Sequence, residues 1–92
     1  MILYDPNSSI TYNACTGFYT GKGNYKFAIE SSHKAIKLNP KSSSAYFGRG
    51  LVYYEMGKYG KAIKDFKTVL KMLPNNIYAK QYMEKARQKR GW

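Results

Sequence analysis

A 34-residue period is the feature of this sequence that most restricts its fold. When the sequence is compared with itself at that offset, aromatic, small and proline residues coincide. The matching pairs are Tyr12 with Tyr46, Tyr19 with Tyr53, Gly23 with Gly57, Tyr25 with Tyr59, Ala28 with Ala62, Ile29 with Ile63, Lys37 with Lys71, and Pro40 with Pro74. A fixed period of this length predicts a repeat protein in which each unit is one supersecondary motif.

The types and positions of the matching residues predict a helical hairpin in each unit. Glycine at 23 and 57 suits the left-handed conformation that often ends a helix. Proline at 40 and 74 cannot continue the helix that precedes it. The paired tyrosines of each unit lie seven residues apart, on one face of its first helix. We therefore expect helices at about 9–21, 25–38, 43–56, 59–72 and 77–89.

The short connections between these helices predict antiparallel packing of neighbours, and so an all-α fold. Pro6 lies 34 residues before Pro40, which suggests the end of a preceding hairpin. The predicted organisation is the end of a truncated repeat at 1–8, repeats at 9–42 and 43–76, and a capping helix with a tail at 77–92.

The second unit resembles the tetratricopeptide repeat, whose pattern is W-x2-L-G-x2-Y, then A-x3-F, then P. Its matching residues are Tyr46, Arg49, Gly50, Tyr53, Ala62, Phe66 and Pro74. The first unit is similar but looser, and departs from the pattern at Cys15, Thr16 and Ser32. The resemblance implies a right-handed α-solenoid of antiparallel hairpins that serves as a protein–protein interaction scaffold.

The resemblance also implies a concave groove, lined by the first helix of each unit, that binds a peptide of a partner protein. The candidate groove residues are Asn13, Gly17, Phe47, Gly48, Leu51, Tyr54, Tyr78, Tyr82 and Lys85. Aromatic residues are common anchors of interfaces. Each glycine inside a helix costs about 1 kcal/mol against alanine. Close helix packing and access for a ligand both explain Gly17 and Gly48, and the sequence leaves the two explanations open.

One family function lacks its residues in this chain. The carboxylate clamp that grips acidic chaperone tails uses lysine, asparagine and arginine on successive concave helices. Here the corresponding places hold Asn13 and Gly17, then Gly48, then Tyr78 and Tyr82. The resemblance therefore does not predict chaperone-tail binding.

The charge favours an anionic partner. Sixteen Lys and Arg residues against five Asp and Glu residues give a net charge of +11. Five lysines recur at steps of three and four residues along the helix expected at 59–72, namely Lys58, Lys61, Lys64, Lys67 and Lys71. This basic face is either a solvated outer surface or a contact for an acidic protein, a nucleic acid or anionic lipid. We expect an acidic peptide as the partner, with nucleic acid as the alternative.

Catalysis and metal binding find little support in the sequence. His33 is the only histidine, and the acidic residues are scattered without the spacing of paired catalytic carboxylates or metal ligands. Cys15 is the only cysteine, and we expect it to be a small buried apolar residue. The sequence thus predicts a protein that is not an enzyme and has no cofactor.

The N-terminal end of the array raises a separate question. Solenoid units contact only their neighbours, and about three are needed for stability. Either the chain is a piece of a longer protein, or its exposed N-terminal face is covered by homo-oligomerisation. No apolar run approaches the roughly 18 residues of a membrane span, and the start lacks a signal peptide, so we expect a cytoplasmic protein.

Overall fold

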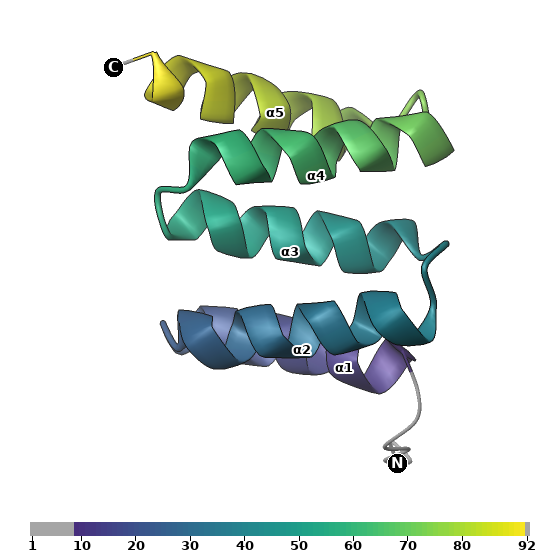
Figure 1. The fold of residues 1–92 in the computed structure, drawn as a ribbon. Coiled ribbons are helices and arrows are strands. Elements are labelled where there is room, and N and C mark those ends of the chain that lie inside the picture. The colour runs from purple at the N-terminus through teal and green to yellow at the C-terminus, as the bar shows by residue number, and fades with distance from the viewer. Residues whose placement is uncertain (1–8, 92) are drawn as a thin grey trace.

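The computed structural model describes residues 9–91, which form five α-helices and no strand. The helices are α1 (Ser9–Gly21), α2 (Tyr25–Leu38), α3 (Ser43–Glu55), α4 (Tyr59–Met72) and α5 (Ile77–Arg90) (Figure 1). These bounds confirm the predicted helices to within one residue at either end. The truncated repeat predicted at 1–8 lies outside the described residues.

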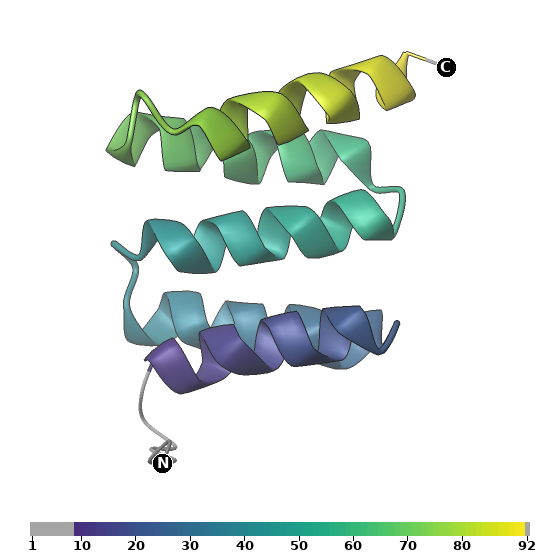
Figure 2. The same cartoon turned by 180° about the vertical axis from the view of Figure 1, so that it is seen from behind.

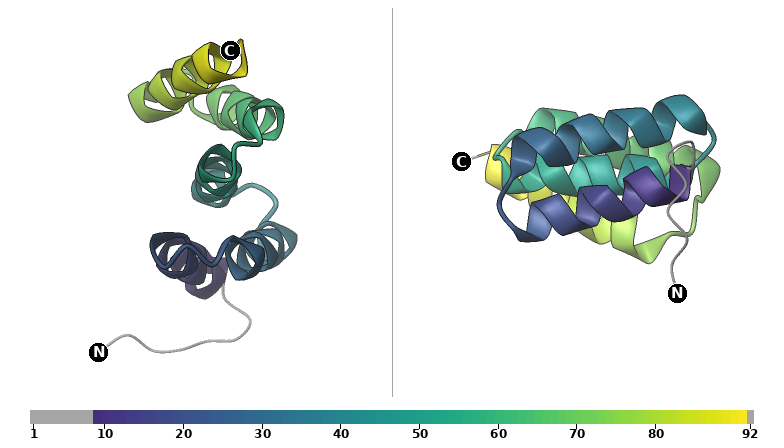
Figure 3. Two further views of the ribbon diagram at one scale, coloured as in Figure 1. Left: turned by 90° about the vertical axis from the view of Figure 1, so that its left-hand side faces the viewer. Right: turned by 90° about the horizontal axis from the view of Figure 1, so that it is seen from below.

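The helices stack as two antiparallel hairpins and a closing helix. The hairpin of α1 and α2 occupies one end, α3 and α4 form the next, and α5 covers α4 (Figures 1 and 2). The first helices also touch across the units, α1 against α3 and α3 against α5, whereas α2 and α4 make no contact with each other. The stack therefore curves, with α1, α3 and α5 on its inner side (Figure 3). This is an all-α helical solenoid.

The first helix of each hairpin ends in the same hydrogen-bonded turn. Gly23 and Gly57 have positive φ angles, of 75° and 81°. The backbone N–H of Asn24 donates to the carbonyl of Tyr19 at 2.9 Å, and that of Gly23 donates to Thr20 at 3.0 Å. These two bonds are those of the Schellman motif, which satisfies the last carbonyls of a helix. Both glycines thus have the role that the period predicts.

Small residues let the helices approach closely. Ala28 and Ala62, which match at the 34-residue offset, are both fully buried. Gly50 lies against the ring of Phe66, where an added Cβ atom would be only 2.7 Å from the nearest ring carbon. Phe66 is itself fully buried and is the largest side chain of the core. The core is therefore a narrow layer between paired helices, and its packing is sensitive to a single methyl group.

An ion pair that the sequence does not predict joins α3 to α4. The Arg49 guanidinium donates to both carboxylate oxygens of Asp65, at 2.7 and 2.9 Å, and Asp65 is 3% exposed. The same guanidinium lies between the rings of Tyr46 and Tyr53, at 5.4 and 6.0 Å from their centroids. A planar guanidinium suits both contacts, because it binds a carboxylate with two parallel bonds and stacks on aromatic faces. The bond to Asp65 raises the pKa of Arg49.

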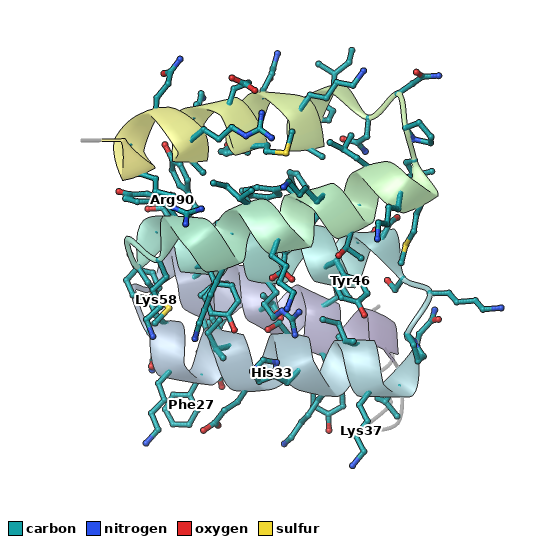
Figure 4. All side chains as sticks on the ribbon, turned by 45° about the horizontal axis from the view of Figure 1, so that its top comes forward. Phe27, His33, Lys37, Tyr46, Lys58 and Arg90 are labelled. Carbon is teal, nitrogen blue, oxygen red and sulfur yellow. The ribbon has the colours of Figure 1, made fainter. Side chains whose placement is uncertain are left out.

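This ion pair also reaches the preceding hairpin. An Arg49 side-chain nitrogen lies 3.2 Å from Nδ1 of His33 on α2, and Figure 4 shows His33 below Tyr46 between the hairpins. Burial lowers the pKa of His33, and the positive charge of Arg49 lowers it further. A guanidinium has only donors, so this contact requires Nδ1 of a neutral His33 ring as the acceptor.

The expectation of a buried Cys15 was wrong, since its side chain is only partly buried. Cys15 matches Arg49 at the 34-residue offset. In the second hairpin this position lies against α2, whereas no described helix precedes α1.

No helix within residues 9–91 is both long and apolar enough to cross a membrane.

Candidate binding groove

The inner side of the solenoid contains a hollow of about 510 Å³. It extends from α1 across α3 to the start of α5, and the last turn of α4 and the loop that follows also contribute to its lining. Its lining residues are Asn13, Thr16, Gly17, Thr20, Gly21, Ser43, Ser44, Phe47, Gly48, Leu51, Val69, Leu73, Asn76 and Tyr78. Volumes of a few hundred Å³ are typical of ligand sites in proteins.

The structure separates the two explanations for the helical glycines. At Gly17 an added Cβ atom would meet nothing within 4 Å, so helix packing does not require glycine there. At Gly48 the added atom would lie 3.2 Å from the Asn13 side-chain oxygen and 3.6 Å from the Thr16 methyl group. A side chain at Gly48 would therefore require the Asn13 side chain to move by a few tenths of an ångström, whereas Gly17 leaves an open part of the hollow.

The sides of the hollow combine apolar surface with a free amide. Phe47 and Leu51 come from α3, and Tyr78, which is 67% exposed, comes from α5. The hydroxyl of Thr16 donates to a carbonyl of its own helix. The Asn13 side chain makes no hydrogen bond to any residue in 9–91, so both its donors and its acceptor are available to a ligand.

Three predicted groove residues lie outside the hollow, in an aromatic cluster beside it. The Tyr82 ring is 5.8 Å from Tyr54, 5.9 Å from Phe47 and 6.0 Å from Phe66. The Lys85 ammonium lies 5.0 Å above the Tyr82 ring. The structure thus brings six predicted residues together in the hollow, and it places Tyr54, Tyr82 and Lys85 next to them. Phe47 belongs to both groups.

Several lining residues were not predicted from the sequence, namely Thr16, Gly21, Ser43, Ser44, Val69, Leu73 and Asn76. Ser43 and Ser44 begin α3, one turn before Phe47 and Gly48, so the helical spacing could have identified them. Val69 belongs to the second helix of its hairpin and Leu73 follows that helix as its C-cap, and no pattern in the sequence places them on the inner side. Asn76 caps α5, its side-chain oxygen accepting from the backbone of Ala79 at 2.9 Å.

The hollow itself carries no charged side chain within the described residues. Cations lie beside it, at the aromatic cluster. The Lys89 ammonium is 4.9 Å from the centre of the Tyr54 ring, and the Tyr54 hydroxyl raises the pKa of Lys89. Lys85 and Lys89 thus form a positive edge at the α5 end of an otherwise neutral groove.

The predicted basic face lies on α4 and at its N-cap. All five of its lysines, Lys58, Lys61, Lys64, Lys67 and Lys71, are exposed. Within residues 9–91, ion pairs join only Arg49 with Asp65 and Arg87 with Glu84, so none of the five lysines is neutralised by an acid. Lys61 makes a second kind of contact, its ammonium lying 5.5 Å from the centre of the Tyr53 ring.

Metal-binding chemistry is not indicated by the arrangement of the side chains. Within the described part of the chain, no three His, Cys, Asp or Glu side chains are grouped so that they could hold a metal ion.

Two family models match the chain. The model described as "Tetratricopeptide repeat" matches residues 43–76, and the one described as "TPR repeat" matches residues 19–57. Neutrophil cytosol factor 2 of Bos taurus is 40% identical over 74 residues, which cover 80% of this chain and 14% of that protein. Serine/threonine-protein phosphatase 5 of Rattus norvegicus is 31% identical over 84 residues, covering 90% of this chain and 17% of that protein. The chain thus spans between about a seventh and a sixth of the length of these relatives.

Solved structures have the same fold. The crystal structure of MamA protein superimposes with a TM-score of 0.89 at 30% identity, covering 95% of this chain and 48% of that one. The first TPR of Spaghetti (RPAP3), bound to the HSP90 peptide SRMEEVD, gives a TM-score of 0.90 at 26% identity. That match covers 96% of this chain and 70% of the other.

Proposed function

The chain belongs to the tetratricopeptide repeat family, and we propose that its groove binds a peptide segment of a partner protein. The observation that carries this proposal is the uncharged hollow of about 510 Å³, to which α1, α3 and α5 all contribute. Gly17 has no packing role, and its lack of a side chain leaves room for a ligand next to the backbone of α1. A scaffold of this kind needs no catalytic group.

The comparisons support a peptide as the ligand. Two similar domains were solved with peptides bound, the first TPR of Spaghetti (RPAP3) with an HSP90 peptide and the second TPR domain of human RPAP3 with an HSP70 peptide. The second superimposes with a TM-score of 0.85 at 28% identity. These ligands belong to those proteins, and tetratricopeptide domains share a fold while differing in ligand.

The residues of the groove favour a peptide of mixed character. An apolar side chain would contact Phe47, Leu51 and Tyr78, because the hollow offers no charge to bind. The Asn13 amide would bind the peptide main chain. An acidic residue would lie nearer α5, where Lys85 and Lys89 form the positive edge. The preferred ligand is therefore an apolar segment next to an acidic one.

Selection from a random peptide library on the immobilised protein, followed by titration of the selected peptide, tests this proposal. Gly17→Leu fills the open part of the hollow with a residue that helices favour, and we expect it to weaken binding by at least about tenfold. Phe47→Ala should weaken binding to a similar extent. Ile77→Ala is the control, because Ile77 is 63% exposed and does not line the hollow. Unchanged affinity of Gly17→Leu would contradict the groove assignment.

The HSP90 peptide SRMEEVD is a second, defined probe. Its Met and Val are each next to acidic residues, so neither can enter the hollow without bringing a carboxylate with it, and no cation lines the hollow within the described residues. We expect no saturable binding up to about 1 mM peptide, measured by calorimetry or by NMR titration. Micromolar binding would show that Lys85 and Lys89 act as a carboxylate clamp, and the proposed apolar preference would then be wrong.

Polyanion binding is the second candidate function, favoured by the five exposed lysines of the basic face. A single-stranded oligonucleotide at about 50 mM salt tests it, since such binding falls steeply as salt is added. Reversal of charge at Lys58 and Lys64 should abolish binding if the basic face is the site, while Gly17→Leu should have no effect. Failure to bind at low salt would remove this candidate and leave the groove.

A further inference from the structure

We propose that the loop face of the solenoid docks on an anionic lipid surface. The loop face is formed by the two connections that follow second helices, from α2 to α3 and from α4 to α5. Both connections lie on the same side of the molecule, on the right in Figure 1 and on the left in Figure 2. The residues of the loop face are Lys37, Leu38, Lys41, Lys71, Met72, Leu73, Ile77, Tyr78 and Lys80.

The repeat places the same pair of residues at each connection. Lys37 and Leu38 match Lys71 and Met72 at the 34-residue offset, and a proline follows each pair two residues later. Because a proline prevents the helix from continuing, each pair lies in the last turn of its helix. Antiparallel packing then brings both last turns to one side of the solenoid. The loop face is therefore a recurring feature of the units.

Most of the large apolar side chains that are exposed within residues 9–91 belong to the loop face. They are Leu38, Met72, Leu73, Ile77 and Tyr78, which are between 37% and 67% exposed. Their exposure does not depend on where the array begins or ends. Leu38 lies between two described hairpins and is still 44% exposed. Ser44, which matches Tyr78 at the offset, is exposed although α3 contacts helices on both sides. Clustered apolar side chains of this kind mark an interaction site.

Lysines frame these apolar residues, and no acid accompanies them. Segments 37–44 and 71–80 contain four lysines and neither Asp nor Glu. All four lysines are exposed, and none of them forms an ion pair with any residue in 9–91. Each lysine close to an anionic membrane strengthens binding by about fivefold. The charge of the loop face is thus complementary to a negative surface.

The mixture of side chains fits lipid better than nucleic acid or protein. Nucleic acid would bind the lysines and leave the aliphatic side chains in water. Protein interfaces are enriched in Arg and depleted in Lys, and all four cations here are Lys. At a lipid surface, aliphatic side chains enter the acyl boundary, a tyrosine lies at the level of the headgroups, and lysines contact anionic headgroups. Both connections reach one flat surface because they lie on the same side.

The proposal does not depend on peptide binding. Leu73 and Tyr78 also line the hollow, whereas Leu38, Met72 and Ile77 do not. Substitutions at Leu38 and Ile77 therefore test the loop face alone, and Gly17→Leu tests the groove alone.

Co-sedimentation of the native chain with lipid vesicles at about 100 mM salt tests the proposal. Vesicles of phosphatidylcholine with about 30% phosphatidylserine should bind it, and pure phosphatidylcholine should bind at least about 20-fold more weakly. Leu38→Ser and Ile77→Ser should each weaken binding to the anionic vesicles by about fivefold or more. Phe27→Ser is the matched control, because Phe27 is 48% exposed and lies at the end of α2 opposite to Lys37 (Figure 4). It should leave the binding unchanged.

Charge reversal separates the loop face from diffuse attraction by the whole molecule. Lys37→Glu with Lys41→Glu changes the net charge as much as Lys58→Glu with Lys64→Glu. The first pair should weaken vesicle binding by at least about 20-fold. The second pair should weaken it by less than about threefold, since Lys58 and Lys64 lie about 21 and 12 Å from Met72 along α4, beyond a Debye length of about 10 Å.

A polarity-sensitive fluorophore locates the contact without relying on loss of binding. Attached at Leu38→Cys in a chain that carries Cys15→Ser, it should shift its emission to shorter wavelength on anionic vesicles. The same fluorophore at Phe27→Cys should not shift. The proposal would be overturned by absence of binding to anionic vesicles, by equal binding to neutral ones, by equal effects of the two charge reversals, or by equal shifts at both labelled sites.

Discussion

At the scale of single residues, two helical glycines have opposite structural roles. Gly50 is required by packing, since an added Cβ atom would lie 2.7 Å from the Phe66 ring. That ring is fully buried and contacts Phe47 and Tyr82, so it has little room to move. At Gly17 the added atom would meet nothing within 4 Å. The same residue type therefore reflects close packing at one site and open space at the other.

Alanine at these two positions should change the free energy of unfolding in opposite directions. Gly50→Ala should lower it by about 2 kcal/mol, because strain from overpacking exceeds the gain in helix propensity. Gly17→Ala should raise it by about 0.5–1 kcal/mol, since only the propensity changes. Urea unfolding followed by circular dichroism measures both values. A stabilising Gly50→Ala would show that Phe66 can move, and that the packing between α3 and α4 is loose.

At the scale of helices, the units are joined by a polar contact as well as by apolar packing. Arg49 on α3 holds Asp65 on α4 and also reaches His33 on α2. The polar contacts that join these three helices, from two hairpins, therefore all involve the guanidinium of Arg49. This arrangement makes the junction between the hairpins sensitive to protonation of His33.

The junction should weaken in acid. Burial and the charge of Arg49 lower the pKa of His33 below its ordinary value of 6.5, so the unfolded chain binds this proton more readily than the folded one. The contribution of His33 to stability is thus fully present above about pH 6.5 and is lost as the pH falls below it. Melting temperatures of the native chain and of His33→Gln, measured between pH 8 and pH 5, test this. The variant should lose less stability over that range, and parallel curves would contradict the assignment.

Helix caps differ between the first and second helices of the hairpins. Ser42 and Asn76 cap α3 and α5, each accepting a hydrogen bond from a backbone N–H three residues later. Lys58 at the start of α4 makes no such bond. Ser42→Ala and Asn76→Ala should each lower the free energy of unfolding by about 1 kcal/mol, and Lys58→Ala should have little effect. Thermal or urea unfolding distinguishes these outcomes, and equal losses at all three sites would refute the role of the caps.

At the scale of the whole molecule, a net charge of +11 on 92 residues opposes the compact state. Acidic side chains offset little of this positive charge, since only two ion pairs form within residues 9–91. We expect the melting temperature to rise by roughly a few degrees between about 20 and 500 mM NaCl, as repulsion is screened. Lys64→Glu with Lys67→Glu should reduce this rise. A melting temperature that falls with salt would mean that favourable ion pairs outweigh repulsion.

The sequence alone determined the elements of this protein. The turn glycines, the prolines and the tyrosines recur at a fixed offset, and each acts within its own hairpin. For that reason the helix bounds, the left-handed turns and the buried alanines could be predicted from local rules. The family resemblance then gave the inner side of the solenoid, on which six predicted residues do line one hollow.

Only the tertiary structure decided which side chains face which neighbour. Tyr82 lies in the aromatic cluster rather than in the hollow, because its ring packs against Phe47 and Phe66 on two other helices. Arg49 replaces an apolar residue of the repeat pattern, and its partner Asp65 becomes visible only when α3 and α4 are placed side by side. Phe18 matches Val52 at the 34-residue offset, yet Phe18 is exposed in the fold and Val52 is fully buried. These properties depend on contacts between helices, and a period along one chain does not specify them.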